Sequence, residues 1–155
     1  MANIDWGNLL FSFSGRINRG KFWLAVLIYI IISIILTIIT AVIGSPTVTN
    51  ILGFVVNLAV FISGLSVAAK RLHDRNRSAW WLLVFYIVPG LLMGIGMAIA
   101  LYGALGSGGG SMTTVGSLLS LVGFGVGIWA FVELGCLRGT VGPNQYGPDP
   151  LEGRV

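Results

Sequence analysis

The densest group of side chains that could do chemistry lies in one short segment near the middle of the chain. The segment reads Lys70-Arg71-Leu72-His73-Asp74-Arg75-Asn76-Arg77-Ser78 and continues through Ala79 into Trp80-Trp81. A His beside an Asp suggests a catalytic pair, but consecutive residues of a helix point about 100° apart. No Ser-centred nucleophile motif and no second His accompany them. An enzyme acting on lipid headgroups through His73 and Asp74 is therefore only an alternative function.

Metal and cofactor chemistry have even less support in the sequence. The chain has 1 His and 1 Cys, and they fall on different predicted elements. A zinc site takes about three or four protein ligands. Cys136 also has no partner for an internal disulfide. We expect no metal, no cofactor and no catalytic residue.

The same segment is strongly basic, which points to anionic partners. Asp74 is the only acid among its four cations, so we expect it to pair with Arg71 or Arg77. Trp80 and Trp81 belong at the headgroup level, where indole rings anchor helices. The residues predicted to bind anionic lipid or a partner protein are Arg16, Arg19, Lys70, Arg71, Arg75, Arg77, Trp80 and Trp81. A second copy of the chain is a further candidate partner.

The elements that must position these residues are predicted to be membrane spans. Hydrophobic residues make up 55% of the chain and charged residues 9%, whereas a soluble domain is about 25% charged. A spanning helix needs about 20 apolar residues. Four runs qualify, and they are residues 22–43, 51–69, 80–102 and 115–137. We therefore predict an all-α, four-helix membrane bundle that forms one domain over residues 1–155.

The charges in the connecting segments predict the topology. All 9 Lys and Arg residues lie in residues 1–21, 70–79 and 138–155, including Arg154, whereas the Gly/Ser-rich loop 103–114 has no charge. Short loops rich in Lys and Arg remain cytoplasmic, so both termini are predicted inside. Because every cation flanks a span, we expect contact with headgroups and not with nucleic acid.

The segment before the first span has the periodicity of an amphipathic helix. Trp6, Leu10, Phe13 and Ile17 recur at steps of four and three residues, which places them on one helical face. We predict a short helix lying in the membrane interface, or alternatively packed against the ends of the spans. Asn18 is positioned to N-cap the first span.

Small residues within the spans predict where helices approach closely. The predicted contacts are the stripe Ser33, Thr37 and Ala41, the pair Gly64 and Ala68, and the G-x-x-x-G pairs Gly90 with Gly94 and Gly123 with Gly127. Pro89 interrupts the third span and predicts a kink, either static or a moving hinge.

Two polar residues within the spans could be functional. Glu133 is the only ionisable residue inside a span, and such residues are often functional. It lies four residues before Leu137, at the predicted inner end of the span. We expect a structural ion pair with an inner-face arginine such as Arg71, Arg16 or Arg138. Asn57 is expected to make an interhelical hydrogen bond. The alternative is a small transporter or channel that uses Glu133 and Asn57.

Three motifs in the chain resemble the domain of unknown function 805 (DUF 805) family of small bacterial inner-membrane proteins. They are Gly15-Arg16-Ile17-Asn18-Arg19 with Phe22-Trp23, Arg71-Leu72-His73-Asp74 with Arg77-Ser78 and Trp80-Trp81, and Asn144 with Tyr146-Gly147-Pro148-Asp149-Pro150. The chain departs from the family pattern at Lys21, Lys70, Asn76 and Ala79. The resemblance implies the location and the architecture but no biochemistry.

The leading functional hypothesis follows from the charges. We expect a non-enzymatic membrane protein whose basic cytoplasmic face binds anionic lipid or a partner protein. The tail, residues 138–155, contains three prolines in Pro143, Pro148 and Pro150. It is therefore predicted to form an extended, turn-rich strap below the bundle.

Overall fold

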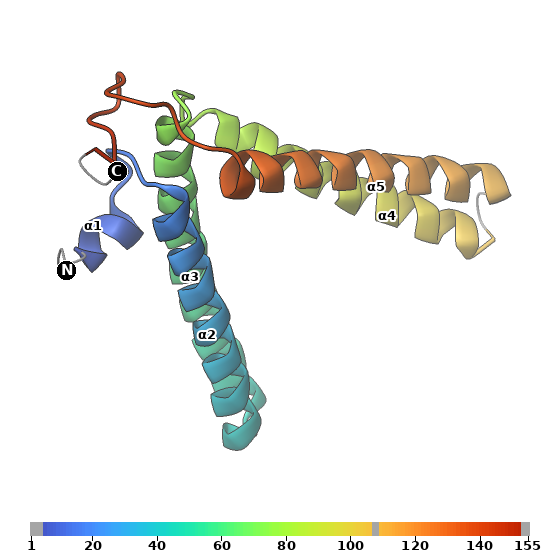
Figure 1. Cartoon of the computed structure of the whole chain (residues 1–155). Helices are drawn as coiled ribbons and strands as arrows, with labels where there is room; N and C mark the ends of the chain where they lie inside the picture. The colour runs from blue at the N-terminus through green and yellow to red at the C-terminus, as the bar shows by residue number, and fades with distance from the viewer. Residues whose placement is uncertain (1–4, 107–108, 153–155) are drawn as a thin grey trace. The chain divides into compact units, whose positions relative to one another are not determined.

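The computed structural model describes residues 5–106 and 109–152, and their regular structure is helical. Arg154 and the loop residues Ser107 and Gly108 lie outside these ranges. The helices are α1 (Trp6–Phe11), α2 (Arg19–Ile43), α3 (Pro46–Asp74), α4 (Val88–Ala104) and α5 (Gly109–Phe131), with π-helical turns η1 (Leu83–Ile87) and η2 (Val132–Cys136). Figure 1 shows their order along the chain.

Four helical segments in the described residues are long and apolar enough to cross a membrane. The shortest has 22 residues, which corresponds to about 33 Å at 1.5 Å per residue and exceeds a hydrocarbon core of about 30 Å. This confirms the predicted all-α architecture with four membrane-length helices. The first, second and fourth helices are longer than the predicted spans. The second begins at Pro46 and ends at Asp74, and the fourth begins at Gly109 within the predicted outer loop.

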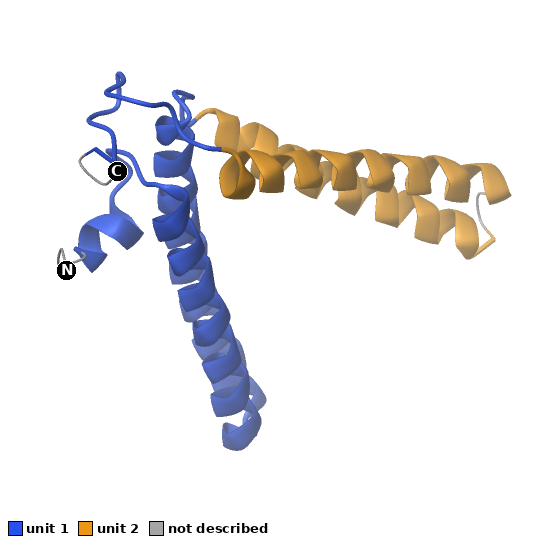
Figure 2. Ribbon diagram, in the orientation of Figure 1, with its two compact units in different colours: residues 1–79, 138–155 blue, residues 80–137 orange. Residues whose placement is uncertain are grey.

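The chain forms two compact units, coloured separately in Figure 2. Unit 1 contains residues 1–79 and 138–155, and unit 2 contains residues 80–137. Each unit includes one hairpin of two membrane-length helices, α2 with α3 and α4 with α5. That both hairpins form a single domain stays a prediction.

Local signals in the sequence set the ends of α2. The Asn18 side chain accepts a hydrogen bond from the Lys21 backbone N–H at 2.9 Å, as the N-cap prediction required. The helix ends at Gly44, whose φ of 66° is left-handed, a conformation that glycine adopts without steric cost. Pro46 then starts α3, where the missing N–H of proline removes no helical hydrogen bond. The result is a tight turn between two spans.

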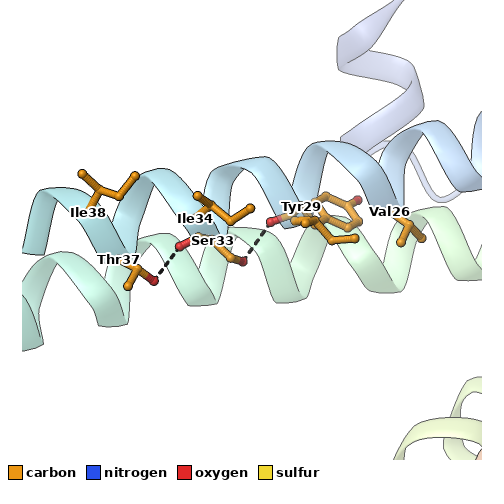
Figure 3. Close-up of a pocket in the computed structure, with 7 residues that line it drawn as sticks. Val26, Tyr29, Ser33, Ile34, Thr37 and Ile38 are labelled. Atoms are coloured by element: carbon orange, nitrogen blue, oxygen red, sulfur yellow. Dashed lines mark hydrogen bonds between the residues drawn. The ribbon is translucent and has the colours of Figure 1, made fainter.

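The predicted small-residue stripe on α2 does not contact another helix within unit 1. Ser33, Thr37 and Ala41 are exposed. The Ser33 and Thr37 hydroxyls donate to the carbonyls of Tyr29 and Ser33, both at 2.8 Å. They therefore line a shallow groove of about 470 Å³ on α2 itself (Figure 3). A hydroxyl four residues after a carbonyl can satisfy itself within its own helix, and contact of this stripe with another helix stays a prediction.

Other predicted polar and small contacts in α3 also differ. The Asn57 amide donates to the Gly53 carbonyl of the same helix at 2.8 Å, and the residue is exposed. This replaces the expected interhelical hydrogen bond. A Cβ on Gly64 would meet nothing within 4 Å. The hairpin instead has a hydrogen bond between the Tyr29 and Ser63 hydroxyls at 2.7 Å.

In unit 2, α4 and α5 approach closely through glycines spaced seven residues apart. A Cβ on Gly116 would lie 2.3 Å from the Ala100 nitrogen, and one on Gly96 would lie 2.6 Å from the Gly116 carbonyl oxygen. Gly103 and Gly123 are similarly crowded. Seven residues are about two helical turns, so each helix presents a single glycine face. A Cβ on Gly90, Gly94 or Gly127 would meet nothing within 4 Å, so the predicted contacts at these three positions stay predictions.

The two π-helical turns interrupt the spans of unit 2. Pro89 is the second residue of α4 and directly follows η1. A π-helical turn contains one more residue than an α-helical turn. It can therefore accommodate the backbone hydrogen bond that is missing at Pro89, which has no N–H. The predicted kink at Pro89 and its role as a hinge stay predictions. Glu133 lies in η2 and is 3% exposed, and its ion pair with an arginine also stays a prediction.

Candidate functional site

The end of α3 brings the central basic segment into a defined geometry. The Arg77 N–H donates to the Leu72 carbonyl at 2.9 Å, and the Asn76 N–H donates to the His73 carbonyl at 3.0 Å. These two bonds form a Schellman motif, which requires a left-handed residue. Asn76 supplies it with a φ of 57°. Asparagine is one of the few residues other than glycine that adopt this conformation readily.

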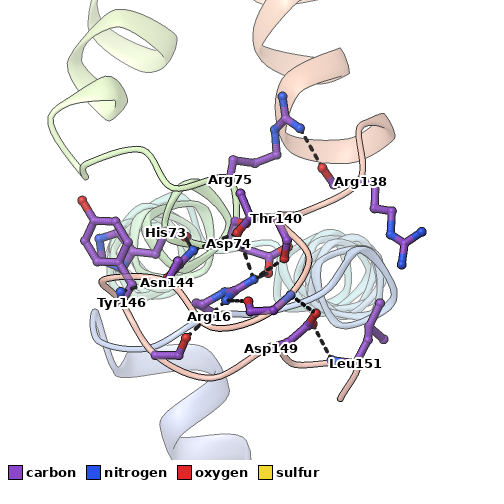
Figure 4. Close-up of polar contacts among 12 residues, drawn as sticks. Arg16, His73, Asp74, Arg75, Arg138, Thr140, Asn144, Tyr146, Asp149 and Leu151 are labelled. Carbon is purple, nitrogen blue, oxygen red and sulfur yellow. Dashed lines mark hydrogen bonds and ion pairs between the residues drawn. The ribbon is translucent and has the colours of Figure 1, made fainter. Parts of the chain in front are cut away.

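Arg16 is the centre of a buried polar cluster formed by unit 1. Its Nε and Nη2 donate to Asp74 Oδ1 at 3.2 and 3.1 Å. Its Nη1 donates to the Gly142 and Gly147 carbonyls at 2.8 and 3.2 Å. Its Nη2 also reaches the Thr140 carbonyl at 2.7 Å and hydroxyl at 3.1 Å. One guanidinium therefore joins the N-terminal segment, α3 and the C-terminal tail (Figure 4).

Asp74 is the acid that this cluster depends on. Its second oxygen pairs with Arg71, which is one of the two partners expected. The side chains of Arg16 and Asp74 are only 1% and 4% exposed. Thr140 adds hydrogen bonds from its N–H and hydroxyl to the Asp74 carbonyl, at 2.8 and 3.0 Å. Asp74 is thus held from both its side chain and its backbone.

A glycine permits the tail to pass beside Asp74. A Cβ built on Gly139 would lie 1.9 Å from Asp74 Oδ2. Any other residue at this position would collide with the carboxylate. Gly139 is therefore a part of the cluster that the sequence analysis did not single out.

The tail itself is a turn-rich strap, as predicted. Asn144 and Gly147 form an isolated antiparallel bridge, and the Asn144 amide donates to the His73 carbonyl and to the Thr140 hydroxyl, both at 2.9 Å. Asp149 accepts from the N–H groups of Leu151 and Gly142, also at 2.9 Å. These two bonds, that from Leu151 above all, lower the pKa of Asp149 below its usual value.

His73 has a structural environment and not that of a catalytic dyad. Its Nδ1 is 3.2 Å from the Gly15 carbonyl, and a carbonyl can only accept, so Nδ1 carries the proton. Its ring stacks on Tyr146 with centroids 4.0 Å apart and an angle of 5°. Asp74 meanwhile binds Arg16 and Arg71. The two candidate catalytic residues are therefore directed to different partners.

A second cluster of bonds holds α1 against α3. Lys70 Nζ donates to the carbonyls of Asn8 and Leu9, the latter at 2.6 Å. Ser66 Oγ donates to the Leu10 carbonyl at 2.6 Å. The Asn8 carbonyl also accepts from the Ser12 N–H at 3.3 Å, whereas the carbonyls of Leu9 and Leu10 lie in the last turn of α1, where the helix itself offers no donor. Lys70 is buried as a result.

The predicted basic face is thus divided into two sets. The side chains of Arg16, Lys70 and Arg71 are buried and bonded within unit 1, and their binding to headgroups stays a prediction. Arg19 is exposed, whereas Arg75 and Arg77 are half-buried, and Arg75 Nη1 donates to the Arg138 carbonyl at 2.7 Å. Burial of a cation depends on which segments fold over it, and spacing along the chain does not reveal that.

The two predicted anchoring tryptophans also separate. Trp80 is exposed. Trp81 packs in unit 2 edge-on to Trp129 with ring centroids 5.7 Å apart, and Phe85 lies 5.1 Å from Trp129. Only Trp80 therefore has the exposure expected of a residue at the headgroup level.

Sequence reasoning missed Thr140 and Ser66 as well as Gly139. Thr140 and Gly139 directly follow the fourth span and precede the proline-rich strap, and Ser66 lies four residues before Lys70.

In residues 5–106 and 109–152, no group of three or more His, Cys, Asp or Glu side chains could hold a metal ion.

These features define a small multi-pass membrane protein in which a buried arginine ties the tail to the end of the second span. Residues 10–148 match the model of a family described as "Protein of unknown function (DUF805)". The chain belongs to this family.

Three relatives from Escherichia coli (strain K12) are similar over most of their length. Inner membrane protein YhaI is 30% identical over 142 residues, which cover 92% of this chain and 88% of that protein. Inner membrane protein YhaH is 28% identical, with 90% and 87% covered. Uncharacterized protein YiiR is 27% identical, with 90% and 86% covered. No solved structure matches the chain. The helices and these relatives identify a multi-pass protein of the bacterial inner membrane.

Proposed function

We propose that the protein is a non-enzymatic inner-membrane protein whose cytoplasmic face binds anionic lipid headgroups. The observation that carries the proposal is that the cations fall into a buried set and a more exposed set. Arg16, Lys70 and Arg71 are saturated by internal acceptors, and they build a rigid platform. Exposed Arg19 and half-buried Lys21 and Arg77 lie in the same unit.

The charge balance supports an anionic partner. The chain has 9 Lys and Arg against 5 Asp and Glu, a net charge of +4. Asp74 is occupied by Arg16 and Arg71. Each Lys or Arg near an anionic leaflet contributes about 1 kcal/mol, so three cations such as Arg19, Lys21 and Arg77 suffice for measurable enrichment of acidic lipid.

The contacts also argue for binding and against catalysis at this site. The groups that could move protons, His73 and Asp74, are each engaged by internal partners. A binding platform needs such rigidity, because fixed cations lose less conformational entropy when they meet a phosphate.

The experiment compares lipid retention in nanodiscs that contain phosphatidylglycerol and phosphatidylcholine, by native mass spectrometry. The variant Arg19→Gln/Lys21→Gln/Arg77→Gln should retain less phosphatidylglycerol than the wild type. Loss of three charges corresponds to a weakening of up to about a hundredfold at low salt. The preference should also decline as salt rises, because exposed charges are screened over about 8 Å at physiological ionic strength.

A charge-preserving variant, Arg19→Lys/Lys21→Arg/Arg77→Lys, is the matched control and should retain phosphatidylglycerol. Equal retention by the wild type and the neutralised variant would refute headgroup binding and leave a protein partner as the better explanation.

A further inference from the structure

Helix α1 is too short to be stable by itself, yet it is held in one place. It has 6 residues, and an isolated helix of fewer than about 12–15 residues is marginal in water. The Asp5 side chain caps its first turn by accepting from the Asn8 N–H at 3.0 Å. Its last carbonyls are bound by Lys70 and Ser66 of α3. Tertiary contacts therefore keep α1 folded.

The residues of this segment that face outward in the structure differ from those that the sequence predicted. The helix ends at Phe11, since Ser12 is extended and Gly15 has a φ of 88°. The predicted single face of Trp6, Leu10, Phe13 and Ile17 was therefore wrong. Leu9 and Ile17 are buried in the core of unit 1. Trp6, Phe11 and Phe13 are instead 48%, 57% and 49% exposed.

Of these outward aromatics, Phe11 is continuous with the hairpin of unit 1. Leu10 and Phe11 of α1 line an apolar groove of about 200 Å³ together with Ile32 of α2 and Val55 and Val60 of α3. The last three lie well inside the membrane-length helices. The apolar surface of α1 therefore continues onto the two helices of unit 1 that are long enough to cross the membrane.

We propose that α1 is an interfacial anchor that inserts Trp6, Phe11 and Phe13 into the adjacent lipid leaflet. Lys70 and Ser66 lock it to α3. Its partner is the boundary between headgroups and acyl chains, where aromatic side chains are favoured. This insertion is apolar, so it is independent of the proposed binding of anionic headgroups.

The test measures the depth of α1 with spin labels in vesicles of pure phosphatidylcholine, which removes the contribution of anionic lipid. Phe11→Cys and, separately, Trp6→Cys are made in a Cys136→Ser background of the full chain. Labels at both positions should collide more often with oxygen, which partitions into lipid, than with a water-soluble nickel complex. Greater access of the nickel complex at both positions would overturn the proposal. Shielding from both reagents would also overturn it, because a protein surface would then cover α1.

The lock is tested by the mobility of the label at position 11. Lys70→Met should convert an immobilised spectrum into a mobile one, because the carbonyls of Asn8 and Leu9 lose the bonds that join them to α3. Lys21→Met is the matched control, since it removes a lysine of α2 by the same substitution and keeps Lys70 in place, and it should leave the spectrum unchanged. If Lys70→Met also leaves the label immobilised, Lys70 does not act as the lock.

Discussion

At the scale of single residues, Arg16 illustrates how a buried charge can be fully satisfied at the edge of a membrane. Its guanidinium meets one carboxylate, one hydroxyl and three backbone carbonyls. Carbonyl oxygens provide partial negative charge without the cost of desolvating further acids. The planar fork of arginine can bind several such acceptors at once, which the point charge of lysine cannot do.

Removal of this fork should destabilise unit 1 strongly. Arg16→Gln leaves Asp74 and several carbonyls without a donor, and breaking a buried ion pair costs about 3–5 kcal/mol. Arg16→Lys should recover only part of that loss. The check is the midpoint of unfolding in detergent, with Arg19→Gln as the control because Arg19 is exposed. An equal midpoint for Arg16→Gln and Arg19→Gln would contradict this role.

Glu133 tests whether a buried acid in a span is structural or functional. It is buried within η2, and we predict an ion pair with an arginine. Glu133→Gln should then lower the thermal stability in detergent, since a cation would lose its counter-charge. Unchanged stability combined with loss of a proton-coupled flux in liposomes would instead favour the transporter alternative.

At the scale of elements, the two hairpins differ in how they pack. In α4 and α5 the backbones come close enough that Gly96 and Gly116 leave no room for a Cβ. Van der Waals contact and close backbone approach drive such packing in lipid. The α2–α3 hairpin instead relies on the Tyr29–Ser63 hydrogen bond and on the core formed around Ala25 and Val67.

This difference gives a prediction for unit 2 with an internal control. Gly116→Ala should weaken the α4–α5 hairpin by about 1–3 kcal/mol, the usual cost of overpacking. Gly94→Ala, which adds the same methyl group to open space on α4, should be neutral or slightly stabilising because alanine favours the helix. Unfolding in mixed micelles would compare the two, and an equal effect of both substitutions would disprove the glycine contact.

The turn that ends α3 gives a further prediction. Asn76 is left-handed with a φ of 57°, which costs a β-branched residue more than it costs asparagine or glycine. Asn76→Val should lower the unfolding midpoint, and Asn76→Gly should preserve or raise it. Thermal unfolding of both variants in the same detergent is the measurement. The reverse order would mean that the amide side chain and not the backbone conformation is what matters here.

At the scale of the whole molecule, the distribution of charge predicts the orientation in the membrane. Cations gather in residues 16–21, 70–77 and 138, and the 103–114 connection has none. Cysteines placed at positions 76 and 140 in a Cys136→Ser background should be labelled only after the membrane is permeabilised. A cysteine at position 108 should be labelled in intact cells. The opposite pattern would invert the predicted topology.

Much of the architecture was predictable because its causes are local. The spans follow from runs of apolar residues that are long enough to cross a bilayer, where the backbone must satisfy itself within a helix. Asn18 was identified as the N-cap of the first span, because a few neighbouring residues determine a cap. The turn-rich tail followed from its prolines, and the family motifs marked Arg16, His73 and Asn144 without revealing what they do.

The tertiary structure alone decided which residues are buried and which segments they join. Arg16 and Asp74 are 58 residues apart in sequence. Only the folded strap shields their contact from solvent. Lys70 and Arg71 look like an exposed basic patch until α1 and the tail lie over them. The sequence marks periodicity, charge and turn geometry, because these act within a few residues. Close approach at Gly116 or Gly139, and burial of a cation, depend on packing between distant segments, and no local pattern specifies that.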